Sequence, residues 1–164
     1  MSKLNKRDYA YLTILISLYL ILVLILTRFT YVYGSTTDWQ EQHWVLPEYF
    51  RNLFYKNHDI FPSFAFNNGG GQNIYNFSYY GLYSPIIVIS YFFPFINMLD
   101  YVIITSILVV IASTLLFYIW LKRNNFSSNI CLLISFLFLC SGPLIFQSHS
   151  QIMFNNYIPF LILG

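Results

Sequence analysis

Three polar residues whose types can carry out chemistry lie close together in one polar stretch: Asp38, Glu41 and Gln42. Ser35 or Thr37 can cap a helix that starts near Asp38, and residues at i, i+3 and i+4 of a helix share a face. A carboxylate on that face can act as general base for an acceptor hydroxyl, and a carboxylate pair can hold a divalent cation against a phosphate. A simpler interpretation is that Asp38 is a first-turn acid favoured by the helix dipole, with Glu41 and His43 solvated.

A second candidate is a run of residues that permits unusual backbone conformations: Asn67, Asn68, Gly69, Gly70 and Gly71. Such residues allow positive φ and close backbone approach, so their N–H groups could position a sugar or a phosphate. No Gly-Lys-Ser/Thr follows, so this is not a nucleotide-binding P-loop. An ordinary flexible turn is the alternative.

Aromatic residues follow this glycine-rich run, and they are Tyr75, Phe77, Tyr79, Tyr80 and Tyr83. Aromatic rings can stack on sugar faces, but Trp and Tyr are also enriched where a membrane meets water. We favour the membrane-interface interpretation for Tyr79, Tyr80 and Tyr83.

A third polar group lies near the end of the chain and consists of His149, Gln151, Asn155 and Asn156. Polar residues at the start of an apolar segment are costly in a membrane unless they line a cavity. We therefore expect His149 and Asn155 to contribute hydrogen bonds to such a cavity. The sequence contains no Ser-His-Asp, HExxH or CxxC pattern, and Cys131 and Cys140 lie in an apolar run that suits neither a disulfide nor a metal pair.

The composition indicates an integral membrane protein. Of the 164 residues, 57% are hydrophobic and only 9% are charged, and the mean hydropathy is +0.59. A soluble domain normally carries about 25% charged residues. The net charge of +2 is too small to indicate a nucleic-acid partner. The fold class is therefore an all-α, polytopic helical membrane bundle.

The apolar runs predict membrane spans at about residues 9–29, 101–121 and 130–146, with the start of a fourth at 152–164. Lys3, Lys6 and Arg7 precede the first run, so the positive-inside rule places the N-terminus in the cytoplasm. A cleavable signal peptide is the alternative for this run, but its apolar core would be shorter. The last run is too short to span, which suggests a fragment cut inside a helix.

Residues 30–100 then form a long extracytoplasmic loop. Within it, residues 85–98 are apolar but short and contain Pro94. If they crossed the membrane, Lys122 and Arg123 would lie outside, against the rule. We expect residues 85–98 to form an interfacial or re-entrant helix, and we expect Gly142-Pro143 to kink or stop the third span before a short turn.

The order and spacing of several short motifs resemble the YfhO family of bacterial membrane proteins, which are similar to GT-C type glycosyltransferases. The resemblance covers nearly the whole chain and rests on Asp38 and Gln42, residues 61–67, Gly69–Gly71, Ser84-Pro85, Phe93-Pro94, Lys122-Arg123, Ser141-Gly142 and residues 151–154. It implies several hundred further residues in the complete protein and a multi-pass location in a bacterial plasma membrane. The richness in Ile, Asn, Phe and Tyr fits a Gram-positive source with an AT-rich genome.

The resemblance also implies sugar transfer outside the membrane, from a polyprenyl-phosphate donor to an envelope polymer such as teichoic acid. Asp38 matches the essential aspartate of the first outer loop and would be general base or metal ligand. Gln42 matches a glutamine of the family pattern, while Asn155 falls where relatives often carry an acid. Glu41, Asn67, Gly69, Gly70 and His149 would contribute to substrate binding, with a divalent cation as a candidate cofactor. The alternative is a transporter, flippase or envelope-assembly subunit without catalytic activity.

Overall fold

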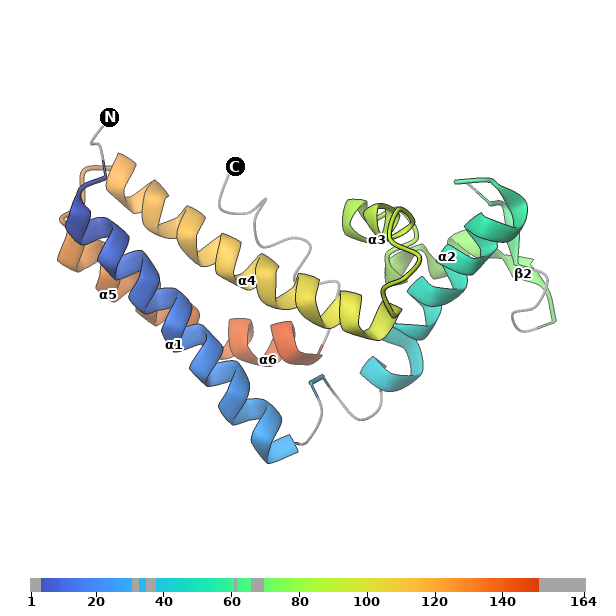
Figure 1. Cartoon of the computed structure of the whole chain (residues 1–164), viewed down its shortest axis with the longest axis horizontal. Helices are drawn as coiled ribbons and strands as arrows, with labels where there is room; N and C mark the ends of the chain where they lie inside the picture. The colour runs from blue at the N-terminus through green and yellow to red at the C-terminus, as the bar shows by residue number, and fades with distance from the viewer. Residues whose placement is uncertain (1–3, 31–32, 35–37, 61, 66–69, 151–164) are drawn as a thin grey trace.

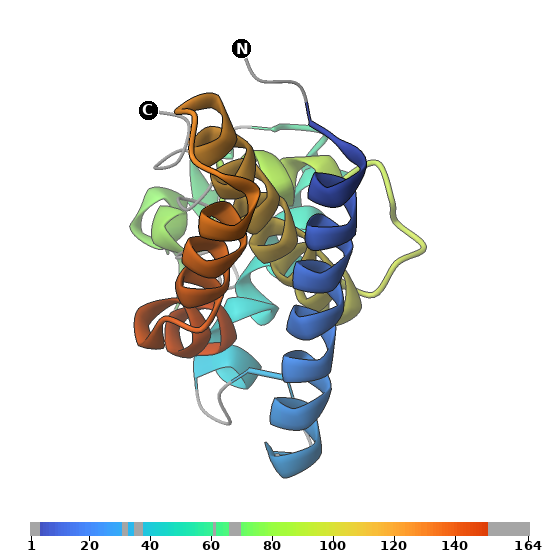
Figure 2. The ribbon, with the colours of Figure 1, turned by 90° about the vertical axis from the view of Figure 1, so that its left-hand side faces the viewer.

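The computed structural model describes residues 4–30, 33–34, 38–60, 62–65 and 70–150. In this part of the chain, three helices form an elongated bundle: α1 (Lys6–Thr30), α4 (Met98–Arg123) and α5 (Ser128–Leu139). They lie side by side in Figures 1 and 2, with α4 antiparallel to the other two. The predicted spans at 9–29 and 101–121 coincide with helices α1 and α4, and their crossing of a membrane stays a prediction.

Two of these helices are long and apolar enough to cross a membrane, by length and composition. They are α1 over Lys6–Arg28 and α4 over Met98–Arg123. The apolar run defines α4, and polar residues define its ends. Asn97 caps its start by accepting the Leu99 N–H at 2.9 Å, and Lys122 and Arg123 occupy its last turn, where cations favour the helix dipole.

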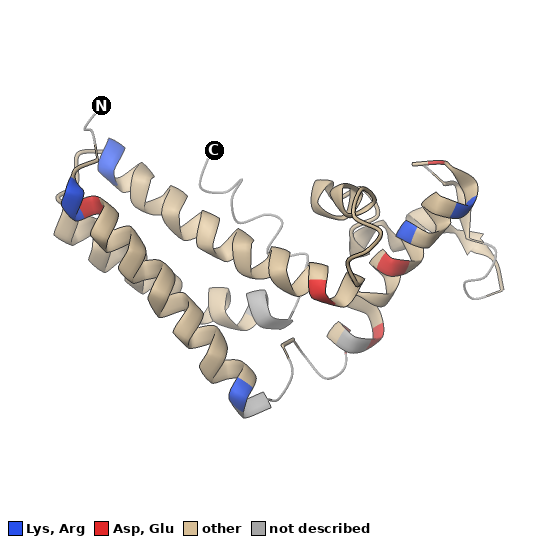
Figure 3. Ribbon diagram, in the orientation of Figure 1, with Lys and Arg blue, Asp and Glu red and all other residues tan. Residues whose placement is uncertain are grey.

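A buried polar cluster joins the three helices at one end of the bundle. The Tyr118 hydroxyl donates to the carboxylate of Asp8 at 2.7 Å, and the Lys122 ammonium lies 3.5 Å from the same oxygen. Lys122 also donates to the Ser128 hydroxyl at 3.1 Å. Basic residues at the start of α1 and at the end of α4 lie at this end (Figure 3), while Arg28 lies in the last turn of α1 at the other end.

The predicted span over residues 130–146 is divided into two helices in the structure. Helix α5 ends at Leu139, and a separate helix, α6 (Gly142–Ser150), follows it. Pro143 has no N–H to donate to the carbonyl of Leu139, and its ring would clash with that carbonyl, so the helix stops where Gly142-Pro143 was expected to stop or kink it. With 12 residues, α5 is about 18 Å long, shorter than a bilayer core of about 30 Å.

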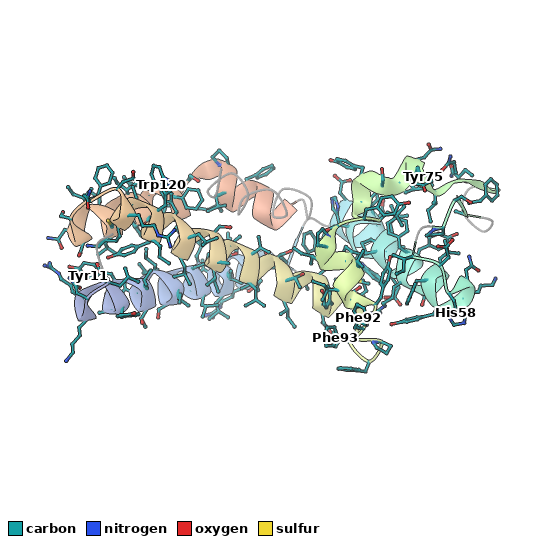
Figure 4. The ribbon with its side chains drawn as sticks, turned by 90° about the horizontal axis from the view of Figure 1, so that it is seen from above. Tyr11, His58, Tyr75, Phe92, Phe93 and Trp120 are labelled. Carbon is teal, nitrogen blue, oxygen red and sulfur yellow. The ribbon has the colours of Figure 1, made fainter. Side chains whose placement is uncertain are left out.

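A short turn was expected at residues 147–151. The structure instead has helix through Ser150, the last residue of α6. In Figures 1 and 4, α6 lies between α5 and the loop unit defined below. The predicted fourth span, residues 152–164, lies outside the described residues.

The described residues between 38 and 97 form a second body, called the loop unit here, at the N-terminal end of α4 (Figure 1). It contains a π-helical turn η1 (Trp39–His43), α2 (Val45–Asn57), an antiparallel hairpin of β1 (Phe64–Ala65) and β2 (Gln72–Asn73), a 3₁₀ segment η2 (Ile74–Tyr80), and α3 (Pro85–Ser90). Its core is formed by fully buried apolar side chains, among them Trp39, Phe50, Ile74, Leu82 and Ile87.

Helix α2 shows why the chain folds this way. Pro47 stands in its first turn, where a missing N–H costs nothing, and His58 ends it in the left-handed conformation. Phe50 and Leu53, on one side of this helix, are buried. By contrast, the helix predicted over residues 85–98 is only six residues long. Beyond Ser90, single turns with i→i+3 bonds replace it, because Pro94 cannot continue a helix.

Candidate functional site

The first candidate residues lie on a π-helical turn. Asp38 has helical backbone angles (φ −62°, ψ −38°), and η1 runs from Trp39 to His43. The expectation that Asp38, Glu41 and Gln42 share a face assumed an α-helix, and that assumption is wrong. A π-helix closes i→i+5 bonds, which brings Asp38 into register with His43. Single π-helical turns occur frequently at functional sites.

Packing of Trp39 holds this turn in place. Its side chain is fully buried, and its ring meets that of Tyr33 edge to face at 5.4 Å. Gly34 lies directly against the same ring, with φ +96°, and a Cβ at position 34 would come within 2.2 Å of the Trp39 Cγ. Glycine is therefore required at position 34 both for its backbone angle and for its missing side chain.

His43 is buried rather than solvated, which the sequence analysis did not expect. Its side chain is 3% exposed, and its ring lies 6.0 Å from the rings of both Trp39 and Tyr80. Its buried Nδ1 has no hydrogen-bond partner among the residues that the structure describes. Burial lowers the pKa of His43, and the nearby negative charge of Asp38 opposes this shift only in part. The imidazole is therefore neutral at physiological pH.

Gln42 is fixed by a hydrogen bond from the 3₁₀ segment. The hydroxyl of Tyr80 donates to Oε1 of Gln42, and Tyr79 packs edge to face on Tyr80 at 5.2 Å. With its carbonyl oxygen occupied, the amide group of Gln42 keeps N–H donors for a ligand. Tyr80, assigned above to a membrane interface, thus belongs to this cluster.

Asp38 and Glu41 are both exposed. Asp38 precedes η1 without a side-chain capping hydrogen bond, so its carboxylate is not used to satisfy the helix terminus. The cluster of Asp38, Gln42, His43 and Tyr80 therefore combines an accessible carboxylate with neutral hydrogen-bonding groups. Such a set can orient a hydroxyl group and accept its proton. We call these four residues the Asp38 cluster.

The glycine-rich run is placed elsewhere. Gly70 and Gly71 have the positive φ angles expected of them, +83° and +97°. Gly70 is exposed, and open space surrounds the position of an added Cβ. The hairpin that carries this run lies beyond the C-terminal end of α2, whereas η1 precedes the N-terminal end (Figure 1). Because α2 is about 20 Å long, Gly70 is not brought into the Asp38 cluster.

The remaining predicted residues can be placed only in part. Asn67, Gly69 and Asn155 lie outside the described residues. The backbone of His149 belongs to α6, and its side chain is outside the described part of the structure. Their roles in substrate binding stay predictions.

The described residues do not form an evident cation site. Among them, no three His, Cys, Asp or Glu side chains are close enough together to hold a metal ion. A divalent cation as cofactor stays a prediction, and the proposal below treats Asp38 as a base.

Sequence reasoning missed His43 and Tyr80. Both belong to the Asp38 cluster through contacts that an α-helical spacing does not reveal. A possible signal was the concentration of Trp39, His43 and Trp44 in six positions, which is more aromatic than a solvated turn requires.

Comparison with known proteins identifies the family. A family model described as bacterial membrane protein YfhO matches residues 11–164. No curated protein and no solved structure matches the chain. The matched range contains the whole Asp38 cluster and α4, and it includes most of α1. With its two helices of membrane-spanning length, the chain belongs to the YfhO family of bacterial membrane proteins.

Proposed function

We propose that this chain takes part in sugar transfer on the extracytoplasmic side of the membrane, from a polyprenyl-phosphate donor to an envelope polymer. The observation that carries the proposal is the Asp38 cluster. It offers an exposed carboxylate that caps no helix, beside a buried neutral imidazole and an oriented amide, in the part of the molecule remote from the basic end of α1 and α4.

The reaction that suits this cluster is an inverting displacement. The Asp38 carboxylate takes the proton of the acceptor hydroxyl while the acceptor oxygen attacks the anomeric carbon. A new C–O bond forms, the bond from that carbon to the phosphate oxygen breaks, and polyprenyl phosphate leaves with the electron pair. A positioned carboxylate base contributes typically 10²–10⁴-fold to such a rate.

The neighbouring residues have supporting roles. The amide N–H groups of Gln42 bind a sugar or acceptor hydroxyl, since Tyr80 holds the other end of that side chain. His43 keeps a neutral environment beside Asp38, because its burial disfavours the charged imidazolium. Glu41 is exposed on the same turn and can contact the acceptor from its outer side.

The test compares Asp38→Asn with Asp100→Asn in membranes that contain the full chain. Asp100 is an exposed acid in the first turn of α4, the structural role that the simpler interpretation gives to Asp38. Incorporation of labelled sugar from polyprenyl-phosphate donors into polymer is measured. We expect Asp38→Asn to lower the rate by about 10²-fold or more, and Asp100→Asn to leave it unchanged.

Equal rates in the two variants would make Asp38 a first-turn acid and would refute its role as base. Absence of transfer in the parent chain, with normal expression and a panel of donors, would instead favour a transporter, flippase or assembly subunit. A transporter would use the same polar cluster for recognition without bond making.

A further inference from the structure

The segment between α3 and α4, residues 91–97, is called the aromatic loop here. It stands out from the body of the molecule in Figure 2. Phe92 is 77% exposed and Phe95 is 79% exposed, and the rings of Phe93 and Phe95 meet edge to face at 6.1 Å. Figure 4 places Phe92 and Phe93 at one edge of the loop unit, opposite Tyr75. Contiguous exposed aromatic surface of this kind marks an interaction site.

The backbone of this region is built for an environment poor in water. Three of its carbonyl groups accept hydrogen bonds from side chains: Tyr91 from the Tyr55 hydroxyl at 2.6 Å, Ile96 from Arg51 at 2.8 Å, and Ile86 from the Tyr101 hydroxyl at 2.6 Å. The N–H groups of Phe92 and Phe93 donate to the carbonyls of Ile89 and Ser90 at the end of α3, and the N–H of Ile96 donates to the carbonyl of Phe93. Each unsatisfied backbone group is costly in lipid, so these hydrogen bonds lower the cost of placing an irregular segment at the membrane interface.

The lack of charged residues around the aromatic loop also favours contact with lipid. Residues 60–99 contain no Asp, Glu, Lys, Arg or His. Inserting this stretch into lipid therefore carries no cost for burying a charge, which is the largest obstacle to insertion.

Position along the chain restricts what can cover the loop. Phe95 lies three residues before Met98, the first residue of the span-length helix α4, so the two Cα atoms are at most about 11 Å apart. The apolar surface also continues past the loop, because Ile89 on α3 and Ile104 and Leu108 on α4 are each at least half exposed. The aromatic loop is thus continuous with the surface that a spanning helix presents to lipid.

The loop is attached rigidly to the helix that follows the Asp38 cluster. Phe54 of α2 stacks on Tyr91, with ring centroids 4.8 Å apart. Arg51, which is 4% exposed, pairs with Glu48 at 2.6 Å while it holds the Ile96 carbonyl. Any partner that fixes the aromatic loop therefore also fixes α2 and the η1 turn before it.

We propose that the aromatic loop inserts Phe92 and Phe95 into the interface of the lipid bilayer and that Arg51 and Tyr55 transmit this anchorage to the loop unit. The partner is the lipid surface itself. Anchorage sets the height of the Asp38 cluster above the membrane, and it holds whether or not the chain transfers sugar.

The test uses single spin labels on the full chain reconstituted in phospholipid vesicles, in a background with Cys131→Ala and Cys140→Ala. Labels are introduced as Phe92→Cys and Phe95→Cys. The matched controls are Asn76→Cys, at an exposed polar position of the same loop unit, and Leu108→Cys, on the exposed apolar face of α4. The accessibility of each label to dissolved oxygen and to a water-soluble nickel chelate is compared.

We expect labels at 92 and 95 to favour oxygen over nickel several-fold more than the label at 76, at a depth of roughly 5–10 Å. Nickel accessibility equal to that of Asn76→Cys would overturn the proposal, because the loop would then lie in water. Inaccessibility to both reagents would also overturn it, because protein would then cover the loop. If a labelled variant fails to fold, Phe92→Trp gives the same decision: quenching by brominated lipids must exceed that of the parent chain.

Discussion

At the scale of single residues, Gln42 and His43 are neighbours in sequence with different surroundings in the folded chain. Gln42 is partly exposed and receives a hydrogen bond from Tyr80, while His43 is buried between aromatic rings. The π-helical turn produces this difference, since one inserted residue shifts which side chains face the core. The chemistry proposed for Asp38 depends on this local geometry.

Gly34 should be one of the least replaceable residues in the described part of the chain. Gly34→Ala brings a Cβ into the Trp39 ring at an unfavourable positive φ, so we expect a loss of stability above the roughly 1–3 kcal/mol of backbone strain alone. Gly70→Ala is the matched control, because Gly70 also has a positive φ but open space around it. Thermal unfolding in detergent measures both, and equal losses would show that the contact with Trp39 contributes nothing.

The burial of His43 predicts how stability depends on pH. Its pKa is lowered in the folded chain, so below pH of about 6.5 the unfolded chain binds a proton that the folded chain does not. Stability should therefore be constant above that pH and should fall as the pH drops toward the folded pKa. His43→Gln should flatten this part of the curve of melting temperature against pH. An unchanged slope in the variant would assign the effect to other groups.

At the scale of elements, the polar cluster around Asp8 fastens α1, α4 and α5 at one end of the bundle. Buried side chains hold the helices in register, because a fully buried carboxylate must keep its partners. The break between α5 and α6 operates at the same scale, since Pro143 ends one helix and allows the chain to change direction.

Removal of the Asp8 carboxylate should destabilise the packing of α1, α4 and α5 at this end of the bundle. Asp8→Ala takes away the group that both Tyr118 and Lys122 contact, and breaking a buried pair costs about 3–5 kcal/mol. Lys6→Ala, an exposed position on the first turn of α1, should be nearly neutral. Denaturant titration in detergent micelles, followed by circular dichroism, compares the two. A similar effect of both variants would refute a structural role for Asp8.

At the scale of the whole molecule, the described chain divides into a helical bundle and a loop unit, with the basic ends of α1 and α4 at the far end from the loop unit (Figure 3). The positive-inside rule then places that basic end in the cytoplasm and the loop unit outside. This orientation, and the GT-C likeness of the bundle, stay predictions.

Labelling of single cysteines in intact cells tests the orientation. Asn76→Cys lies at an exposed position of the loop unit and Asn124→Cys at an exposed position just after α4. In a background without the native cysteines, a membrane-impermeant maleimide should label position 76 in intact cells and position 124 only after permeabilisation. The reverse pattern would place the loop unit in the cytoplasm and would contradict sugar transfer outside.

The sequence by itself was sufficient for the membrane class, the two long apolar helices, the helix stop at Gly142-Pro143 and the family. These follow from local properties: uncharged length, proline geometry and the order of short motifs.

Only the tertiary structure decided the environment of His43, the contact of Gln42 with Tyr80, and the separation of Gly70 from Asp38. Tyr80 is 38 residues from Gln42, and such distant contacts arise from packing that no local pattern encodes. The π-helical turn likewise depends on Trp39 filling the space left by Gly34, an interaction of the folded core. Burial, which sets the charge state of His43, is a property of the assembled molecule and cannot be read from one segment.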